Sequence, residues 1–323
     1  MINGDKESML FNPNSRTSSL DLLLSQEEKE RSKNNAKHIN FQNESDQLPF
    51  PSIPLLIDSS SQEAIHAKSL SKLHYRILPL IFLLSFISYL DRTNLAFVAK
   101  DFQATLHLSD QSYALGAGFF FVGYSSFQVP SNRLLRRFGG IPWLSSLSIL
   151  WGATTMFMSI LEGKLDYWMV RCLLGVFEAG FYPGVVVYLR SFFGEKDFGS
   201  CYALILSATC VALATGGPVI AIIEYVSRIV SPDLDTWRSC FIVQGGLAIL
   251  CGFLLILFQP RTIQSCSFLT SREKEIELEI VNNGVKKEEN LLPLKQILSL
   301  KTMWYYSGGW FLYALPYWGF IYW

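Results

Sequence analysis

The sequence has 323 residues, of which 50% are hydrophobic and 14% aromatic, and its formal net charge at pH 7 is zero. This charge balance argues against a nucleic-acid-binding protein, which normally carries a basic excess. The apolar residues form seven long runs joined by polar links, which leaves too little polar surface for a soluble protein. Each run has about the 20 apolar residues that cross the core of a bilayer. The predicted spans are 77–98, 113–132, 141–161, 166–190, 201–226, 240–259 and 303–323.

Residues 1–76 precede the first span and are rich in Ser, Asn, Asp, Glu and Lys. Their low hydrophobicity predicts a disordered tail. Lys and Arg are concentrated at the end of this tail and in the links after the second, fourth and sixth spans. The positive-inside rule therefore places the N-terminus in the cytoplasm. We expect a multi-pass membrane protein, in the plasma membrane rather than in an organelle.

Residues 77–259 are predicted to form a six-span half, which 260–302 link to the seventh span at 303–323. In this link, Thr270 and Glu273 have the spacing of a capping box, which predicts a short helix at the cytoplasmic surface. The last span stops at Trp323 without a closing charge or a polar tail. We therefore expect a chain that is truncated after span 7, with an incomplete second half.

Full charges lie inside two of the predicted spans. Asp91 and Arg92 are adjacent in "YLDRTN", and a charge at mid-membrane costs on the order of 3 kcal/mol. Adjacent helical residues point about 100° apart, so each needs its own partner. Arg171 and Glu178, in "RCLLGVFEAGFYPG", are two turns apart on one face of span 4. The purely structural alternative is two fixed ion pairs, Asp91–Arg171 and Arg92–Glu178.

Other features of the spans are read more simply. Tyr124 and Gln128 lie one turn apart in span 2, where they either line a cavity or bond to a neighbouring helix. The glycines and the proline of "GVFEAGFYPG" predict close packing and a kink in span 4. Phe119 to Phe121 are assigned to lipid contact or bundle packing. The six cysteines and four histidines follow no metal-ligand spacing, so no metal site is expected.

Four motifs in chain order resemble the major facilitator superfamily, and more narrowly its anion:cation symporter branch, which includes allantoate, nicotinate and pantothenate permeases. They are "YLDRTN", "VGYSSFQVPSNRLLRRFGG", "RCLLGVFEAGFYPG" and "WRSCFIVQGG". The link after span 2 departs from the superfamily signature, because Arg136 stands where an aspartate is usual. The resemblance implies an all-α membrane protein with a helical bundle of two six-helix halves. This chain would hold the N-terminal half plus span 7.

The resemblance also implies roles at matching positions. Asp91 and Glu178 would be the proton-coupling carboxylates. Arg92 and Tyr89 would bind the anion, and Arg171 would belong to the charge network. Three further residues are candidates for substrate binding. Asn94 is a polar residue near the charged pair of span 1, and span 2 contributes Tyr124 and Gln128. The implied partners are a small organic anion and the lipid bilayer, with no nucleic acid, and the only implied cofactor is the proton as coupling ion.

The expected function is therefore proton-coupled symport of a small organic anion of the carboxylate, vitamin or ureide class. One alternative is a seven-span receptor, although the charge bias gives the opposite orientation to that of G-protein-coupled receptors. Another is a truncated protein that does not transport and acts through a partner. An enzyme is disfavoured, because the spans hold no histidine cluster, paired aspartate motif or nucleophile dyad.

Overall fold

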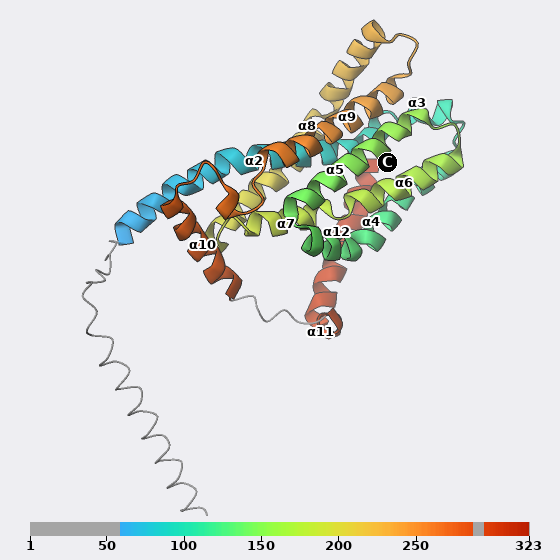
Figure 1. The fold of residues 1–323 in the computed structure, drawn as a ribbon. Coiled ribbons are helices and arrows are strands. Elements are labelled where there is room, and N and C mark those ends of the chain that lie inside the picture. Colours follow the sequence, from blue (N-terminus) through green and yellow to red (C-terminus); the bar gives the residue numbers. More distant parts are fainter. Residues whose placement is uncertain (1–58, 287–293, 323) are drawn as a thin grey trace, which may run out of the picture. The chain divides into compact units, whose positions relative to one another are not determined.

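The computed structural model describes residues 59–286 and 294–322, and every regular element in these ranges is helical (Figure 1). The predicted all-α architecture is therefore confirmed for the described residues. Within the described residues, five helices are long and apolar enough to cross a membrane. They are Ser60–Phe97, Gly140–Ile160, Lys164–Arg190, Glu195–Val230 and Thr236–Phe258.

Helices occur at all seven predicted spans. The first six are α2 (Ser59–Phe97), α4 (Asp110–Phe138), α5 (Gly140–Phe157), α6 (Lys164–Glu178) with α7 (Phe181–Arg190), α8 (Glu195–Val230) and α9 (Thr236–Phe258). The seventh is α12 (Lys301–Tyr322). The shorter elements are α3 (Ala99–Thr105), η3 (Met158–Ile160), η4 (Ile263–Ser265), α10 (Ser271–Lys286) and α11 (Leu294–Ser299). Helix α4, with 29 residues, and helix α12, with 22, also have spanning length but are not among these five.

The prediction that residues 1–76 form a disordered tail is wrong for residues 59–76. Residues 1–58 lie outside the described residues, but 59–76 form the first turns of α2. The reason is a stripe with a spacing of four residues, in which Ser69, Leu73 and Ile77 are fully buried. A helix buries such a stripe on one face. Low average hydrophobicity concealed the pattern, because the exposed faces of these turns are polar.

The buried stripe of α2 packs against α10, the helix predicted in the link. The capping box is confirmed, because the Thr270 N–H donates to Glu273 Oε2 at 2.8 Å and the Glu273 N–H donates to Thr270 Oγ1 at 3.3 Å. Lys72 Nζ of α2 lies 2.7 Å from Glu273 Oε1. Burial alone would raise the pKa of Glu273, but the hydrogen bonds from Lys72 and Thr270 lower it below its usual value. The link is therefore anchored to the first span.

The spanning helices make their closest approaches at glycines. On α4 and α6, a Cβ added at Gly123 would lie 2.0 Å from the carbonyl oxygen of Cys172, and one at Gly175 would lie 2.0 Å from that of Phe120. On α5 and α9, a Cβ at Gly245 would lie 2.4 Å from the carbonyl oxygen of Gly152. Small residues of this kind let helix backbones touch. The pairs α4–α6, α5–α9 and α2–α8 have the most extensive contacts in the bundle.

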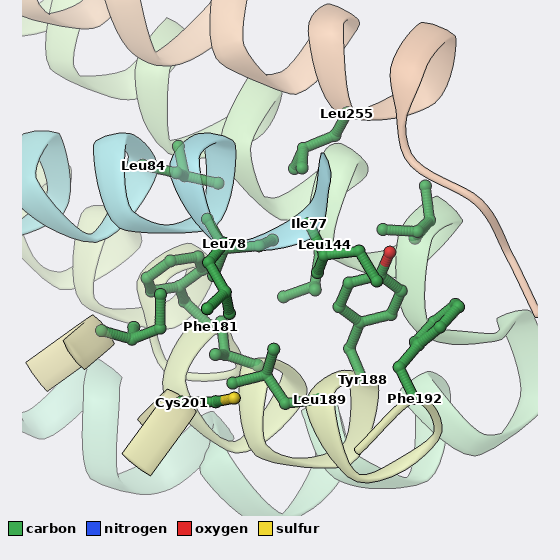
Figure 2. Packing of buried hydrophobic residues seen from close by; sticks show 14 of the residues in the cluster. Ile77, Leu78, Leu84, Leu144, Phe181, Tyr188, Leu189, Phe192, Cys201 and Leu255 are labelled. Carbon is green, nitrogen blue, oxygen red and sulfur yellow. The ribbon is translucent and has the colours of Figure 1, made fainter. Parts of the chain in front are cut away.

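The predicted kink in span 4 is confirmed. Helix α6 ends at Glu178 and α7 begins at Phe181. Pro183 has no N–H to donate to the carbonyl four residues earlier, which interrupts the helix there. Just beyond the break, Phe181 is fully buried in a core shared by α2, α5, α7 and α9, to which Ile77, Leu144 and Leu255 contribute (Figure 2). The break thus lies next to Glu178 and is held by packed side chains.

Candidate functional site

Among the described residues, four Asp, Glu or Arg side chains are buried inside the spans, two from α2 and two from α6. The exposed fraction is 3% for Asp91, 7% for Arg92, and 1% each for Arg171 and Glu178. These are the four charges that the sequence analysis identified. The structure brings them to neighbouring helices, as expected for charges that need partners in a bilayer.

Arg92 and Glu178 form a direct ion pair. The Arg92 Nε–H donates to Glu178 Oε1 at 2.8 Å. The Ser88 hydroxyl, one turn earlier on α2, donates to the same oxygen. Glu178 Oε2 has no hydrogen-bond partner among the described residues. Arg92–Glu178, one of the two ion pairs of the purely structural alternative, is therefore present, and one oxygen of the carboxylate is still available to another donor.

Asp91 lies in a different environment from its neighbour. Its Oδ2 accepts a hydrogen bond from the hydroxyl of Thr155 on α5 at 2.7 Å. Its Oδ1 is buried and has no partner in the described part of the chain. The alternative ion pair Asp91–Arg171 is not formed there, because the structure shows no contact between them within 4.0 Å. The rotation between adjacent helical residues sends Asp91 to α5 and Arg92 to α6.

Aromatic rings surround the Arg92 guanidinium. Its Cζ lies 5.4 Å from the ring centre of Phe120, 5.0 Å from that of Tyr124 and 5.8 Å from that of Tyr182. Arg171 Cζ lies 4.9 Å from the same Phe120 ring. Such contacts are worth about 0.5–2 kcal/mol each, the upper end applying to desolvated sites. Phe120 thus contacts both buried cations, which goes beyond the packing role that the sequence analysis gave it.

The remaining predicted residues differ in how close they come to the charges. Tyr124 contacts Arg92, whereas Gln128 is half-buried and no contact is recorded between it and the four charges. Tyr89 packs in a small apolar cluster with Leu90 of α2 and Ala212 of α8. Asn94 is fully buried, and neither polar atom of its amide has a partner among the described residues.

Sequence reasoning missed several residues of the site. Ser88 could have been found, because it lies one turn before Arg92 in the same helix. Tyr182 follows Glu178 at the same spacing of four residues, and a kink between them is predictable. Thr155 gave no signal, because its place beside Asp91 depends on how α5 packs against α2. No group of three or more His, Cys, Asp or Glu side chains in the described residues could hold a metal ion.

The site combines a buried guanidinium group with two buried carboxyl groups. A buried guanidinium presents planar donors that suit a carboxylate, and here a protein carboxylate occupies part of them. Two carboxyl groups lie nearby, one held by the guanidinium and the other by a hydroxyl. The arrangement thus places a guanidinium, which suits a carboxylate, next to one carboxyl group and a second carboxyl group on another side of α2.

Comparison with known proteins gives consistent results. A family model of the Major Facilitator Superfamily matches residues 81–323. A protein of Agrobacterium vitis named "Putative tartrate transporter" is 32% identical over 218 residues, which are 68% of this chain and 48% of that protein. The "Quinolone resistance transporter" of Acinetobacter baumannii is 29% identical over 216 residues, which are 67% of this chain and 49% of that protein.

A solved structure shares the fold. It is a bacterial homologue of the human lysosomal transporter Spinster in an inward-facing, occupied conformation. Its TM-score is 0.52 at 20% identity, over 57% of this chain and 44% of that chain. At this identity the likeness concerns the fold alone, and it agrees with the predicted helical bundle. The chain spans about half the length of the curated relatives it matches.

Proposed function

Because the chain belongs to the Major Facilitator Superfamily, we propose that it takes part in the proton-coupled transport of a small organic anion. The chain is an integral membrane protein related to transporters. In the proposal, Arg92 binds the carboxylate of the anion, and Asp91 and Glu178 bind the coupling protons. The finer placement in the anion:cation symporter branch is part of the same proposal.

The observation that carries the proposal is the buried Arg92–Glu178 pair, with three aromatic rings around the Arg92 guanidinium. When Glu178 takes up a proton, its ion pair with Arg92 is lost. The substrate carboxylate then replaces it on the guanidinium, where two parallel N–H donors can bind two oxygens. One proton and one negative charge enter together, so the site keeps its net charge. This exchange would link anion binding to proton binding without a large electrostatic cost.

The chemistry of the pocket supports a carboxylate as substrate. Two buried guanidinium groups share the Phe120 ring, and Arg171 Nε and Nη2 have no hydrogen-bond partners among the described residues. Unused N–H groups in a buried site favour an oxygen-rich anion. The relative named for tartrate supports the same class. A ureide or a vitamin-like monocarboxylate would also suit these donors.

A second candidate is the export of a drug-like molecule, which the relative named for quinolone resistance favours. The surroundings of Arg92 include three aromatic rings, which suit a planar aromatic molecule as well as a cation. The two candidates differ in direction. Symport concentrates the anion in the cell when protons flow inward, whereas export lowers the drug content of the cell.

Uptake in cells that express the gene for this chain tests the proposal. Radiolabelled tartrate, nicotinate and allantoate are supplied with an inward proton gradient, and a protonophore is added in a parallel sample. We expect accumulation of at least one anion, its loss with the protonophore, and its loss in Arg92→Ala. The matched control is Arg228→Ala, because Arg228 is an exposed arginine paired with Glu224. Normal accumulation by Arg92→Ala would exclude this arginine as the anion site.

A further inference from the structure

A second set of buried polar groups lies near Asp91 and is not used by the Arg92–Glu178 pair. Asn94 on α2 is 0% exposed and Gln244 on α9 is 2% exposed. Both polar atoms of each amide lack a hydrogen-bond partner among the described residues, and so does Asp91 Oδ1. A buried polar group left unsatisfied costs about 1–3 kcal/mol. Several unsatisfied donors and acceptors in one region indicate that they form hydrogen bonds with a partner from outside the chain.

The packing of α9 on α2 places the two amides at the same level along the helices. At one end, Gln259 Nε2 donates to the carbonyl oxygen of Arg76 at 3.1 Å. At the other end, the ring of Phe102, just beyond α2, lies 5.1 Å from that of Trp237. The helices therefore run antiparallel, and Gln244 lies between these contacts at the level of Asn94. It also lies on the buried face of α9.

Helix α5 contacts α9 at the same level along the bundle. A Cβ at Gly245 would lie 2.7 Å from the backbone nitrogen of Met156, so the residue after Gln244 touches α5 there. Thr155, the neighbour of Met156, donates its hydroxyl proton to Asp91. Asp91 and Asn94 of α2, Thr155 of α5 and Gln244 of α9 therefore lie at one level along the bundle. The Arg92–Glu178 pair lies toward α6, on another side of α2.

The chemistry of the orphaned atoms selects their partner. Each amide offers both a donor and an acceptor, and water satisfies both, whereas a cation would satisfy only the oxygens. Buried water molecules typically make about three hydrogen bonds to such groups. The charged groups that face Asp91 are Arg92 on its own helix and Arg171 and Glu178 on α6. Thr155 of α5 and Gln244 of α9 are neutral, so neither of them provides a counterion for Asp91.

We propose that Asn94 and Gln244 hold ordered water molecules beside Asp91 and position them for proton transfer to its Oδ1. Each water accepts one proton and passes one on, so no electrons move and no other reactant is consumed. The two amides are positioning residues in a proton route that is separate from the anion site at Arg92. This inference rests on the proposed function, because it assumes that Asp91 binds a coupling proton.

The first test uses transport by Gln244→Met, which keeps the length of the side chain and removes the amide. Proton-driven uptake is expected to fall about 10-fold, less than the ~100-fold or more that a positioned acid or base itself contributes. Its pH optimum is expected to shift. Counterflow of labelled against unlabelled anion at equal pH needs no net proton release and should stay normal. Gln244→Asn, which keeps an amide, should recover part of the driven uptake.

The matched control is Ser145→Ala, because Ser145 on α5 is also fully buried with a hydroxyl that has no partner among the described residues, but lies almost three turns away from Thr155. It should leave driven uptake and its pH profile unchanged. Equal loss of driven uptake and counterflow in Gln244→Met would mean a structural role and would overturn the inference. An unchanged pH profile and driven uptake would overturn it as well.

The second test does not depend on transport, so it separates failure of this inference from failure of the proposed function. The melting temperatures of the purified chain and of Gln244→Met and Asn94→Leu are compared in detergent. If water fills the site, each substitution removes hydrogen bonds from that water, and the melting temperature falls. If the site is dry, removing an orphaned amide raises the melting temperature, and the inference is wrong.

Discussion

Removing the carboxylate of Glu178 leaves Arg92 buried without its counterion. The two side chains are 1% and 7% exposed and are joined at 2.8 Å, so neither can be hydrated without opening the bundle. Breaking a buried pair on one side costs about 3–5 kcal/mol of the free energy of unfolding, whereas replacing both partners with apolar residues is often close to neutral. We therefore expect Glu178→Met to be strongly destabilised and the double variant Arg92→Met with Glu178→Met to recover most of that loss.

The assay is equilibrium unfolding of the purified chain in mixed detergent micelles, with the two single variants, the double variant and the wild type as a cycle. Glu224→Met is the matched control, because Glu224 pairs with Arg228 at an exposed position. An exposed pair contributes about 0–1 kcal/mol. A cost below about 1 kcal/mol for Glu178→Met, similar to that of the control, would refute the interpretation of a desolvated ion pair.

Three further predictions concern neighbouring features. Phe120→Leu removes the ring shared by the two arginines, and losing a contact of about 1 kcal/mol should raise the KM for the anion about five-fold while the chain stays folded. Since the pKa of Glu273 is lowered, its contribution to anchoring α10 is present above its unfolded pKa and is lost as the pH falls through the folded value. The protection factors of the α10 amides, which are corrected for the slower intrinsic exchange at low pH, should therefore fall on acidification, and should fall less in Lys72→Met. Gly175→Leu should prevent α4 and α6 from meeting and abolish the monodisperse peak in size-exclusion chromatography, whereas Gly118→Leu, where a Cβ meets nothing within 4 Å, should not.

Sequence reasoning predicted the helices well, because apolar runs of spanning length are a strong local signal. It also identified the four buried charges, since charges in a bilayer need partners and few were available. The Arg92–Glu178 pair was one half of the structural alternative, and the other half, Asp91–Arg171, is not formed. It failed at the start of α2, where the buried stripe through Ser69 and Leu73 has a polar background. The average composition of that segment resembles a tail, and only its period of four residues indicates a packed helix.

The rest of the site depends on contacts between helices. Nothing in the sequence near Thr155 indicates that its hydroxyl bonds to Asp91, because the two residues are far apart in the chain and belong to helices whose rotation is set by packing. The same is true of Gln244, which reads as a single polar residue in an apolar span. Phe120 is one of three consecutive phenylalanines, and only the structure shows which of them contacts the arginines.

The most direct test of the central claim is anion counterflow by Glu178→Gln as a function of external pH. The amide has the shape of a protonated carboxyl and carries no charge. The account predicts that the variant still exchanges the anion, with a weaker dependence on pH than the wild type because only Asp91 still titrates, and that it does not accumulate the anion against a gradient as the wild type does. Accumulation by Glu178→Gln with the pH dependence of the wild type would contradict the claim that this carboxyl exchanges its proton for the anion on Arg92.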